Sequence, residues 1–167
     1  MGVTLTLSRI DSPIGALGLA ADADGVVRGV SFGGDPARVM RRDYPGAAME
    51  DGPAPTAVTD ALAAYFGGAR EALARVRWAV EGHHFNARVW RELARVPAGM
   101  TISYGEMARR AGEPGAAQAA GVALNRNPIP LILPCHRVIG ADGALVGFGG
   151  GLEMKTWLLR HEGALLI

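Results

Sequence analysis

The sequence has almost no cysteine and no long apolar run. Cys135 is the only cysteine among 167 residues, which excludes an internal disulfide and a cysteine-rich zinc site. No apolar run reaches the length of about eighteen residues that a membrane-spanning helix needs. Residues 1–10 also lack the basic start and apolar block of a signal peptide. We therefore expect a cytoplasmic protein without membrane partners, in which Cys135 is a free thiol.

An excess of charge of one sign is missing as well, because the formal net charge is +1. Its distribution is nevertheless uneven. Residues 1–84 carry eight Arg against ten Asp or Glu, whereas residues 85–137 carry seven Arg against three Glu, which leaves the second segment at about +4. This local charge suits a polyanion, but it falls short of the strongly basic composition typical of nucleic-acid-binding domains. Charge alone favours DNA only modestly.

The N-terminal part of the chain has the pattern of a small antiparallel sheet. Three segments within residues 3–32 alternate apolar and polar side chains and are separated by turn signals. Residues 33–55 are rich in Gly, Pro and Asp, which predicts a surface connection with a short helix over residues 37–42. The remaining predictions for this lobe are a helix with Thr56 as its N-cap and a strand over residues 74–81.

From residue 85 the periodicity becomes helical. Residues 85–96 place apolar side chains at helical spacing and are followed by Pro97. Two short helices, over residues 104–112 and 115–125, have the length and turn chemistry of a helix-turn-helix. An ordinary αα-hairpin is the alternative that this local pattern leaves open. A final helix is predicted over residues 152–161.

These patterns predict an α+β fold with two lobes. The first lobe, residues 1–83, contains the antiparallel sheet and a helix. The second lobe, residues 84–167, is helical and contains the helix-turn-helix and Cys135.

Cys135 lies in the stretch "NPIPLILPCHRVIG", and its sequence neighbours favour a reactive thiol over an inert core residue. Burial habits alone favour the inert alternative. His136 and Arg137, however, place two potential cations beside the sulfur, which would favour the thiolate. Three prolines also stiffen the backbone around it, at Pro128, Pro130 and Pro134.

The same stretch raises a geometric difficulty for a Cys–His pair. Adjacent residues on an extended segment point to opposite faces, so direct hydrogen bonding of Cys135 to His136 would need a water relay or a bent backbone. Glu162, in "RHEG", is the carboxylate available to orient His136.

The sequence offers little for a metal or a cofactor, and we predict neither. His83 and His84 are adjacent, but no further His or Cys stands at ligand spacing. The "GFGGG" loop at residues 147–151 lacks the Lys and Ser or Thr that a phosphate-binding P-loop carries.

Three motifs in order, "SYGEMARRAG", "NPIPLILPCHRVIG" and "GFGGGLEMKTWLLRHEG", resemble the O6-alkylguanine-DNA alkyltransferases, also called methylated-DNA–protein-cysteine methyltransferases. The resemblance extends upstream to "DSPIGALGLA", and so covers nearly the whole chain. It implies a monomer whose helix-turn-helix enters the minor groove of double-stranded DNA and flips the alkylated guanine out of the base stack. Cys135 would then take the alkyl group as a thioether in a single turnover, with O4-alkylthymine as an alternative lesion.

The resemblance also assigns residue roles. It implies that His136, through a water held with Glu162, takes the proton of the Cys135 thiol. Tyr104 would donate to the leaving guanine, Asn127 would hold the turn before an active-site strand, and backbone groups of Cys135, Val138 and Gly149 would read the guanine edge. The predicted substrate- and DNA-binding residues are Tyr104, Gln118, Asn127, Arg137, Val138, Phe148 and Gly149.

The sequence departs from the family pattern at three positions. Gln118 stands where the family has an arginine that replaces the flipped base in the stack, which predicts weaker or slower lesion capture; Arg126 could compensate. Phe148 and Gly149 stand where some members have Tyr and Ser. Two alternatives remain: a lesion-binding homologue without catalysis, against which Cys135 argues, and an alkyltransferase repurposed for a nonstandard lesion or a small molecule.

Overall fold

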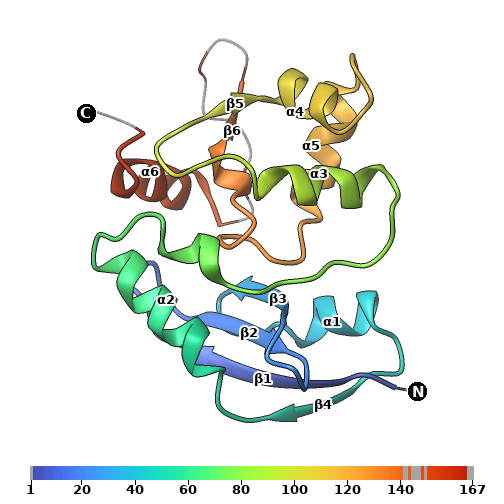
Figure 1. Ribbon diagram of the computed structural model, residues 1–167, viewed down its shortest axis with the longest axis vertical. Coiled ribbons are helices and arrows are strands. Elements are labelled where there is room, and N and C mark those ends of the chain that lie inside the picture. The colour runs from blue at the N-terminus through green and yellow to red at the C-terminus, as the bar shows by residue number, and fades with distance from the viewer. Residues whose placement is uncertain (1, 141–142, 144–147, 149, 165–167) are drawn as a thin grey trace. The chain divides into compact units, whose positions relative to one another are not determined.

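The computed structural model describes residues 2–140, 143, 148 and 150–164 and divides the chain into two compact units (Figure 1). The first unit is Met1–Glu81 with Pro128–Pro130, and the second is Gly82–Asn127 with Leu131–Ile167. We predicted lobes 1–83 and 84–167. The structural division differs by falling after Glu81 and by adding Pro128–Pro130 to the first unit. The amide of Val30 donates to the carbonyl of Pro128 at 2.9 Å, which holds that segment to the sheet.

The first unit is built on a four-stranded sheet with the order β3-β2-β1-β4. Its strands are β1 (Thr4–Ile10), β2 (Leu17–Ala21), β3 (Val27–Phe32) and β4 (Ala48–Asp51). β2 pairs antiparallel with both β1 and β3, but β4 pairs parallel with β1. The antiparallel pairing predicted for the first three strands is confirmed, but β4 lies within residues 33–55, which we expected to form a surface connection, and it makes the sheet mixed. The connection from β3 carries the chain to the opposite edge of the sheet, so that β4 runs in the direction of β1.

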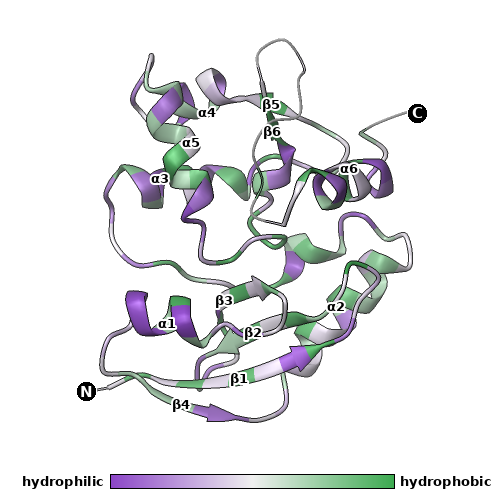
Figure 2. Ribbon diagram, turned by 180° about the vertical axis from the view of Figure 1, so that it is seen from behind, coloured by the Kyte–Doolittle hydropathy of each residue, from purple (hydrophilic) through white to green (hydrophobic). Residues whose placement is uncertain are grey.

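Three helical segments complete the first unit: α1 (Ala37–Asp43), α2 (Thr56–Phe66) and the 3-10 helix η1 (Ala72–Arg75). α1 confirms the short helix predicted in the connection. Met40 of α1 packs into the core with Leu5 and Ala20, all three fully buried. A Cβ at Gly29 of β3 would meet the end of the Met40 side chain, so a larger residue there would require Met40 to move. Figure 2 shows β2 as largely hydrophobic and α1 as mostly hydrophilic.

Two local predictions for this unit are wrong. Pro55, not Thr56, is the N-cap of α2, and no side chain caps the helix. Residues 74–81 form only an isolated bridge from Trp78 to Val27. η1 takes the first of these residues, and Pro128 rather than the predicted strand accepts the hydrogen bond of Val30 farther along β3.

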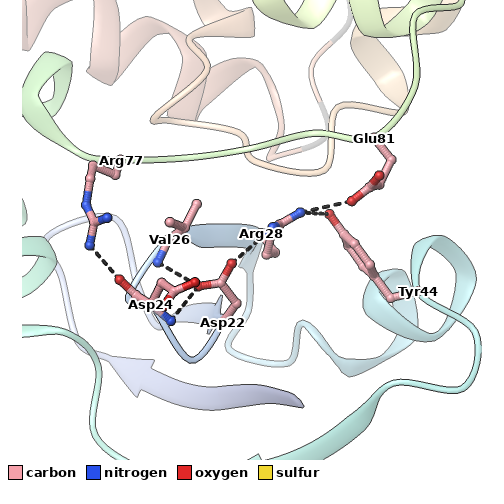
Figure 3. Close-up of polar contacts among 7 residues, drawn as sticks. All are labelled: Asp22, Asp24, Val26, Arg28, Tyr44, Arg77 and Glu81. Atoms are coloured by element: carbon pink, nitrogen blue, oxygen red, sulfur yellow. Dashed lines mark hydrogen bonds and ion pairs between the residues drawn. The ribbon is translucent and has the colours of Figure 1, made fainter. Parts of the chain in front are cut away.

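Polar side chains tie the end of the first unit to its sheet (Figure 3). Arg28 of β3 forms ion pairs with Asp22 at 3.0 Å and with Glu81 at 2.9 Å. The Tyr44 hydroxyl accepts a longer hydrogen bond of 3.4 Å from the same guanidinium. Arg28 thus holds the last residue of the continuous N-terminal segment.

The second unit is mainly helical. Its helices are α3 (Phe85–Leu93), α4 (Tyr104–Arg110), α5 (Ala117–Asn125), the 3-10 helix η2 (Cys135–Arg137) and α6 (Leu152–His161). The short strands β5 (Ile102–Ser103) and β6 (Val138–Ile139) pair in parallel. These bounds confirm the four predicted helices, although α3 ends at Leu93 rather than at 96. No helix within the described part of the chain has the length and apolar character needed to cross a membrane.

Candidate active site

Cys135 begins a tight helical turn, not a strand. η2 has the geometry of about three residues per turn, so successive side chains do not point to opposite faces. The predicted extended segment is therefore wrong, and the bent backbone that a Cys–His pair would need is present. Leu131, four residues earlier, has a φ of 74° and is buried, which marks the tight path by which the chain reaches this turn.

Asn127 binds the segment that leads into this turn. Its side-chain amide donates to the Leu133 carbonyl at 2.8 Å and also forms a hydrogen bond with the Cys135 thiol. After Asn127 the chain forms a loop that leads into η2, and not the active-site strand that we predicted. One side chain therefore fixes both the loop and the sulfur.

His136, Arg137 and Glu162 form a buried ionic cluster. His136 Nε2 lies 2.8 Å from Glu162 Oε2, and both side chains are fully buried. Arg137 donates from Nε and Nη2 to the two carboxylate oxygens at 2.8 and 3.0 Å, and its Nη1 donates to the Val96 carbonyl. Glu162, at the end of α6, thus contacts both His136 and Arg137.

Arg137 differs from its prediction as a substrate- or DNA-binding residue. It is only 7% exposed, and three of its donors are engaged within the protein. The two hydrogen bonds to one carboxylate form the bidentate geometry that an arginine uses to fix an anion. Arg137 therefore holds Glu162 in place, and its guanidinium is buried among protein acceptors rather than exposed at the surface.

The electrostatics of the cluster leave His136 neutral and Glu162 ionised. Burial alone raises the pKa of Glu162, but the hydrogen bonds from His136 and Arg137 outweigh it and set the pKa at about 2. Burial lowers the pKa of His136 more than Glu162 raises it. With Nε2 donating to the carboxylate, Nδ1 is the acceptor of a neutral ring. Nδ1 is buried and has no hydrogen-bond partner in the described residues.

The thiol itself is protonated at rest. Burial raises the pKa of Cys135 to about 11, although Asn127, Lys155 and nearby backbone amides lower it in part. Our expectation that His136 and Arg137 act as two cations favouring the thiolate is wrong, because His136 is neutral and Glu162 neutralises Arg137. Any reaction of this sulfur must therefore remove its proton.

Lys155 is a site residue that the sequence reasoning missed. It lies on α6, is fully buried, and donates from Nζ to the Val138 carbonyl at 2.8 Å. Its charge lowers the pKa of the Cys135 thiol, while burial lowers the pKa of Lys155 itself. One signal could have identified it: Lys155 is the only lysine in the chain, and it stands three and four residues before Leu158 and Leu159 on the apolar face of the predicted helix.

The Val138 backbone is already engaged within the protein. Its carbonyl accepts from Lys155, and its amide donates to the Cys135 carbonyl at the end of η2. A guanine edge could reach the carbonyl only as a second donor. Gly149, the other predicted backbone contact, lies outside the described residues.

Tyr104 and Phe148 lie at the rim of the site. Tyr104 is the first residue of α4, whose N-cap, Ser103, accepts a hydrogen bond from the Glu106 amide at 3.1 Å. Burial raises the pKa of Tyr104, and the proximity of Cys135 raises it further. The Phe148 ring meets the His136 ring edge-on, with 6.4 Å between centroids. Both predicted residues are thus brought to the Cys–His site.

Gln118 occupies a different setting from the site residues. It is exposed in the first turn of α5.

The described residues contain no group of three His, Cys, Asp or Glu side chains that could hold a metal ion. Fold and site together define an α+β protein of two units, in which one buried thiol adjoins a neutral histidine and an ionised carboxylate.

Comparisons with known proteins place this arrangement. The family model described as 6-O-methylguanine DNA methyltransferase, DNA binding domain, matches residues 84–164. A methylated-DNA–protein-cysteine methyltransferase of Methanosarcina acetivorans is 40% identical over 92% of this chain and 96% of that protein. One from Salmonella typhimurium is 45% identical over 68% of this chain but only 66% of that protein. The crystal structure of Mycobacterium tuberculosis OGT in complex with DNA superposes with a TM-score of 0.78 and 38% identity, covering 95% of this chain and 93% of that one. The chain belongs to the methylated-DNA–protein-cysteine methyltransferase family.

Proposed function

We propose that this protein repairs DNA by direct reversal, transferring the alkyl group of O6-alkylguanine irreversibly to Sγ of Cys135. The observation that carries this proposal is that the single thiol is followed directly in the same helical turn by a neutral, carboxylate-oriented histidine whose Nδ1 has no hydrogen-bond partner among the described residues. Family membership supplies the substrate class, since its members act by name on methylated DNA. The same name supports a protein cysteine as the acceptor.

The reaction requires one bond to form and one to break. Sγ of Cys135 attacks the alkyl carbon, forming a C–S bond while the bond from that carbon to guanine O6 breaks. The thiol proton passes, through a water, to Nδ1 of His136, and the resulting imidazolium is stabilised by ionised Glu162. A thiol with a pKa of about 11 makes this base necessary at neutral pH. Lys155 stabilises the developing thiolate.

The leaving guanine needs a proton as its bond to the alkyl group breaks. Tyr104 supplies it, because a pKa raised above the ordinary tyrosine value keeps the phenol protonated at neutral pH. The His136 imidazolium then returns its proton through solvent to the Tyr104 phenolate, and the net result is a Cys135 thioether and an unmodified guanine. Since a thioether is not hydrolysed under these conditions, each protein molecule reacts once.

DNA binding falls to the second unit. α4 and α5 are two short helices joined by a turn, in the part of the chain that carries the local positive charge. We propose that they act as a helix-turn-helix in the minor groove and that the guanine is flipped out of the stack to reach the buried thiol, because an atom inside the duplex is otherwise inaccessible. The protein acts as a monomer.

Gln118 favours one alternative. An exposed glutamine in the first turn of α5, where the family motif has arginine, brings no charge to the gap left by a flipped base. A related activity on a nonstandard lesion or on a small alkylated molecule would need that charge less. The chemistry at Cys135 would be the same.

Intact-mass measurement after incubation with a duplex containing O6-methylguanine tests these proposals. Direct repair adds one methylene to the protein, mapped by peptide analysis to Cys135, and the gain disappears in Cys135→Ala. Binding of the duplex without a mass gain would support a non-catalytic lesion-binding protein. Neither binding nor gain would favour the repurposed alkyltransferase.

A further inference from the structure

Side chains of α3 hold the paired helices α4 and α5 by their backbones. Trp90 of α3 is 8% exposed, and its indole Nε1 donates to the carbonyl of Ala123 in the last turn of α5 at 2.8 Å. That carbonyl also accepts the amide of Arg126, which closes the helix. The indole is therefore an additional donor: α5 does not need it to close its own turn, and its effect is to fix α5 against α3.

Arg88, two residues before Trp90, binds the connection between α4 and α5. Its Nε donates to the carbonyl of Ala111, the C-cap of α4, at 2.9 Å. Its Nη2 lies 3.8 Å from the carboxylate of Glu113, inside the connecting turn. A third donor, Nη1, binds the carbonyl of His83 just before α3 at 3.2 Å. One guanidinium thus joins the start of α3 to the end of α4 and to the turn.

These contacts leave the outward side of α5 unobstructed. Ala120, Ala123 and Leu124 are buried, whereas Gln118 and Arg126 are exposed and Val122 is 50% exposed. The exposed three stand at intervals of four residues and so lie on one face of the helix. α3 holds α5 by a backbone carbonyl and leaves this face available.

We propose that Arg88 and Trp90 are positioning residues for DNA binding, which fix the angle at which α5 presents its Gln118–Val122–Arg126 face. This inference rests on the proposed function. The thiol site is built from other contacts: Asn127 binds Leu133 and Cys135, and Glu162 binds His136 and Arg137. Loss of the α3 contacts is therefore expected to weaken duplex binding and leave the thiol unchanged.

The test uses two conservative variants of the full chain. Trp90→Phe keeps an aromatic ring but removes the N–H, and Arg88→Lys keeps the charge but removes the planar fork. Trp90→Phe removes one hydrogen bond between neutral groups, and Arg88→Lys removes the fork that binds the Ala111 and His83 carbonyls together. We therefore expect the Kd for an O6-methylguanine duplex to rise roughly fivefold in Trp90→Phe and by at least as much in Arg88→Lys. The rate of Cys135 alkylation by iodoacetamide, which needs no DNA, is expected to stay within about twofold, because the thiol site keeps its hydrogen bonds.

Matched controls separate this effect from general perturbation. Trp78→Phe repeats the Trp-to-Phe substitution in the first unit. Arg95→Lys repeats the Arg-to-Lys substitution just after α3, at a side chain that is 76% exposed. Both should leave the duplex Kd unchanged. Glu113→Gln tests the 3.8 Å ion pair alone and is also expected to have little effect, since both of its side chains are largely exposed.

Two results would overturn the inference. One is an unchanged duplex Kd in both Trp90→Phe and Arg88→Lys. The other is a parallel loss of duplex binding and iodoacetamide reactivity, which would assign these residues to the thiol site or to overall stability. Absence of alkyl transfer by the unaltered protein would instead contradict the proposed function, while the duplex Kd values would still decide the role of α3.

Discussion

Each unit of the protein contains an arginine that binds carboxylates, and the two arrangements differ in burial. In the first unit, Arg28 pairs with Asp22 and Glu81 while its own side chain is 20% exposed and that of Glu81 is 65% exposed (Figure 3). In the second unit, Arg137 pairs with fully buried Glu162, which also binds fully buried His136. Solvent screens the Arg28–Glu81 pair, whereas the protein interior strengthens the pair of Arg137 with Glu162.

Because of this difference, the Arg28 cluster has a structural role, whereas the Arg137–Glu162–His136 cluster belongs to the reactive site. The Arg28 contacts hold a chain segment to a sheet. Burial raises the pKa of Asp22, but hydrogen bonds, one of them from Arg28, outweigh it and leave this pKa below its ordinary value. The Glu162 contacts set the protonation of Glu162 and His136, and Nδ1 of His136, the residue next to Cys135, has no hydrogen-bond partner among the described residues. Similar residues thus give a structural contact at the surface and a proton acceptor in the interior.

The largest expected effect is that of Glu162→Gln. The variant removes the charge that stabilises the His136 imidazolium, and we expect alkyl transfer to slow by about 100-fold or more. It also leaves the buried Arg137 guanidinium without its anion, at a cost of roughly 3–5 kcal/mol in unfolding free energy. Single-turnover rates, corrected for the folded fraction from a thermal melt, measure the first effect. A rate within threefold of that of the unaltered protein would contradict the role of Glu162.

Acid stability is the second comparison between the units. The pKa of His136 is lowered by burial, so the unfolded chain binds a proton that the folded protein does not, and stability is lost as the pH falls below the ordinary value of 6.5. Glu162, with a folded pKa of about 2 against an ordinary 4.5, contributes stability above pH 4.5 that is lost toward pH 2. The corresponding window for Asp22 begins lower, at its ordinary value of 3.8.

We therefore expect the unfolding free energy to decrease already between pH 6.5 and 4.5, through the second unit. Denaturant unfolding followed at several pH values measures this slope. His136→Gln should reduce the slope in this window, whereas Asp22→Asn should leave it unchanged. An equal slope in the His136→Gln variant would mean that other groups govern acid stability.

Much of the fold and of the candidate site could be predicted from the sequence, but only those features that depend on residues close together in the chain. Helices α3 to α6 follow from apolar spacing and from Gly or Pro at their ends, and Cys135, His136 and Glu162 follow from motifs that resemble a known family. The parallel pairing of β4 could not be predicted, because its partner Thr4 lies 44 positions from Ala48 in the chain and the strand shows little apolar alternation.

The errors in the site have a common physical cause. Sequence neighbours suggested two cations beside the Cys135 sulfur, but charge state depends on burial and on partners distant in the chain. The Glu162 carboxylate compensates the charge of Arg137, and burial lowers the pKa of His136, which leaves this ring uncharged. Lys155 supplies the positive charge that lowers the pKa of the thiol. None of these three facts can be deduced from the spacing of residues 135–137.

A smaller effect is expected at Gln118, which tests whether the second unit also carries DNA affinity. Gln118→Arg adds a cation to the exposed face of α5, and we expect duplex affinity at low salt to rise roughly three- to tenfold. The dependence of log K on log salt should become steeper by about 0.9. Arg126→Gln, at the end of the same helix, is the matched control and should change the slope by a similar amount in the opposite direction. If affinity and repair rate are both unchanged in Gln118→Arg, the hypothesis of weaker lesion capture fails.

The smallest expected effect is that of Glu81→Gln in the first unit. It removes one exposed partner of Arg28, which keeps its contacts with Asp22 at 3.0 Å and with Tyr44 at 3.4 Å. Because surface ion pairs contribute little, the unfolding free energy should fall by less than about 1 kcal/mol, with most of this loss abolished in high salt. The rate of alkyl transfer should not change, since no group near Cys135 loses a partner. A slower transfer in Glu81→Gln would show that the surface contacts of the first unit also affect the chemistry at Cys135. It would contradict the conclusion that the Arg28 contacts are purely structural.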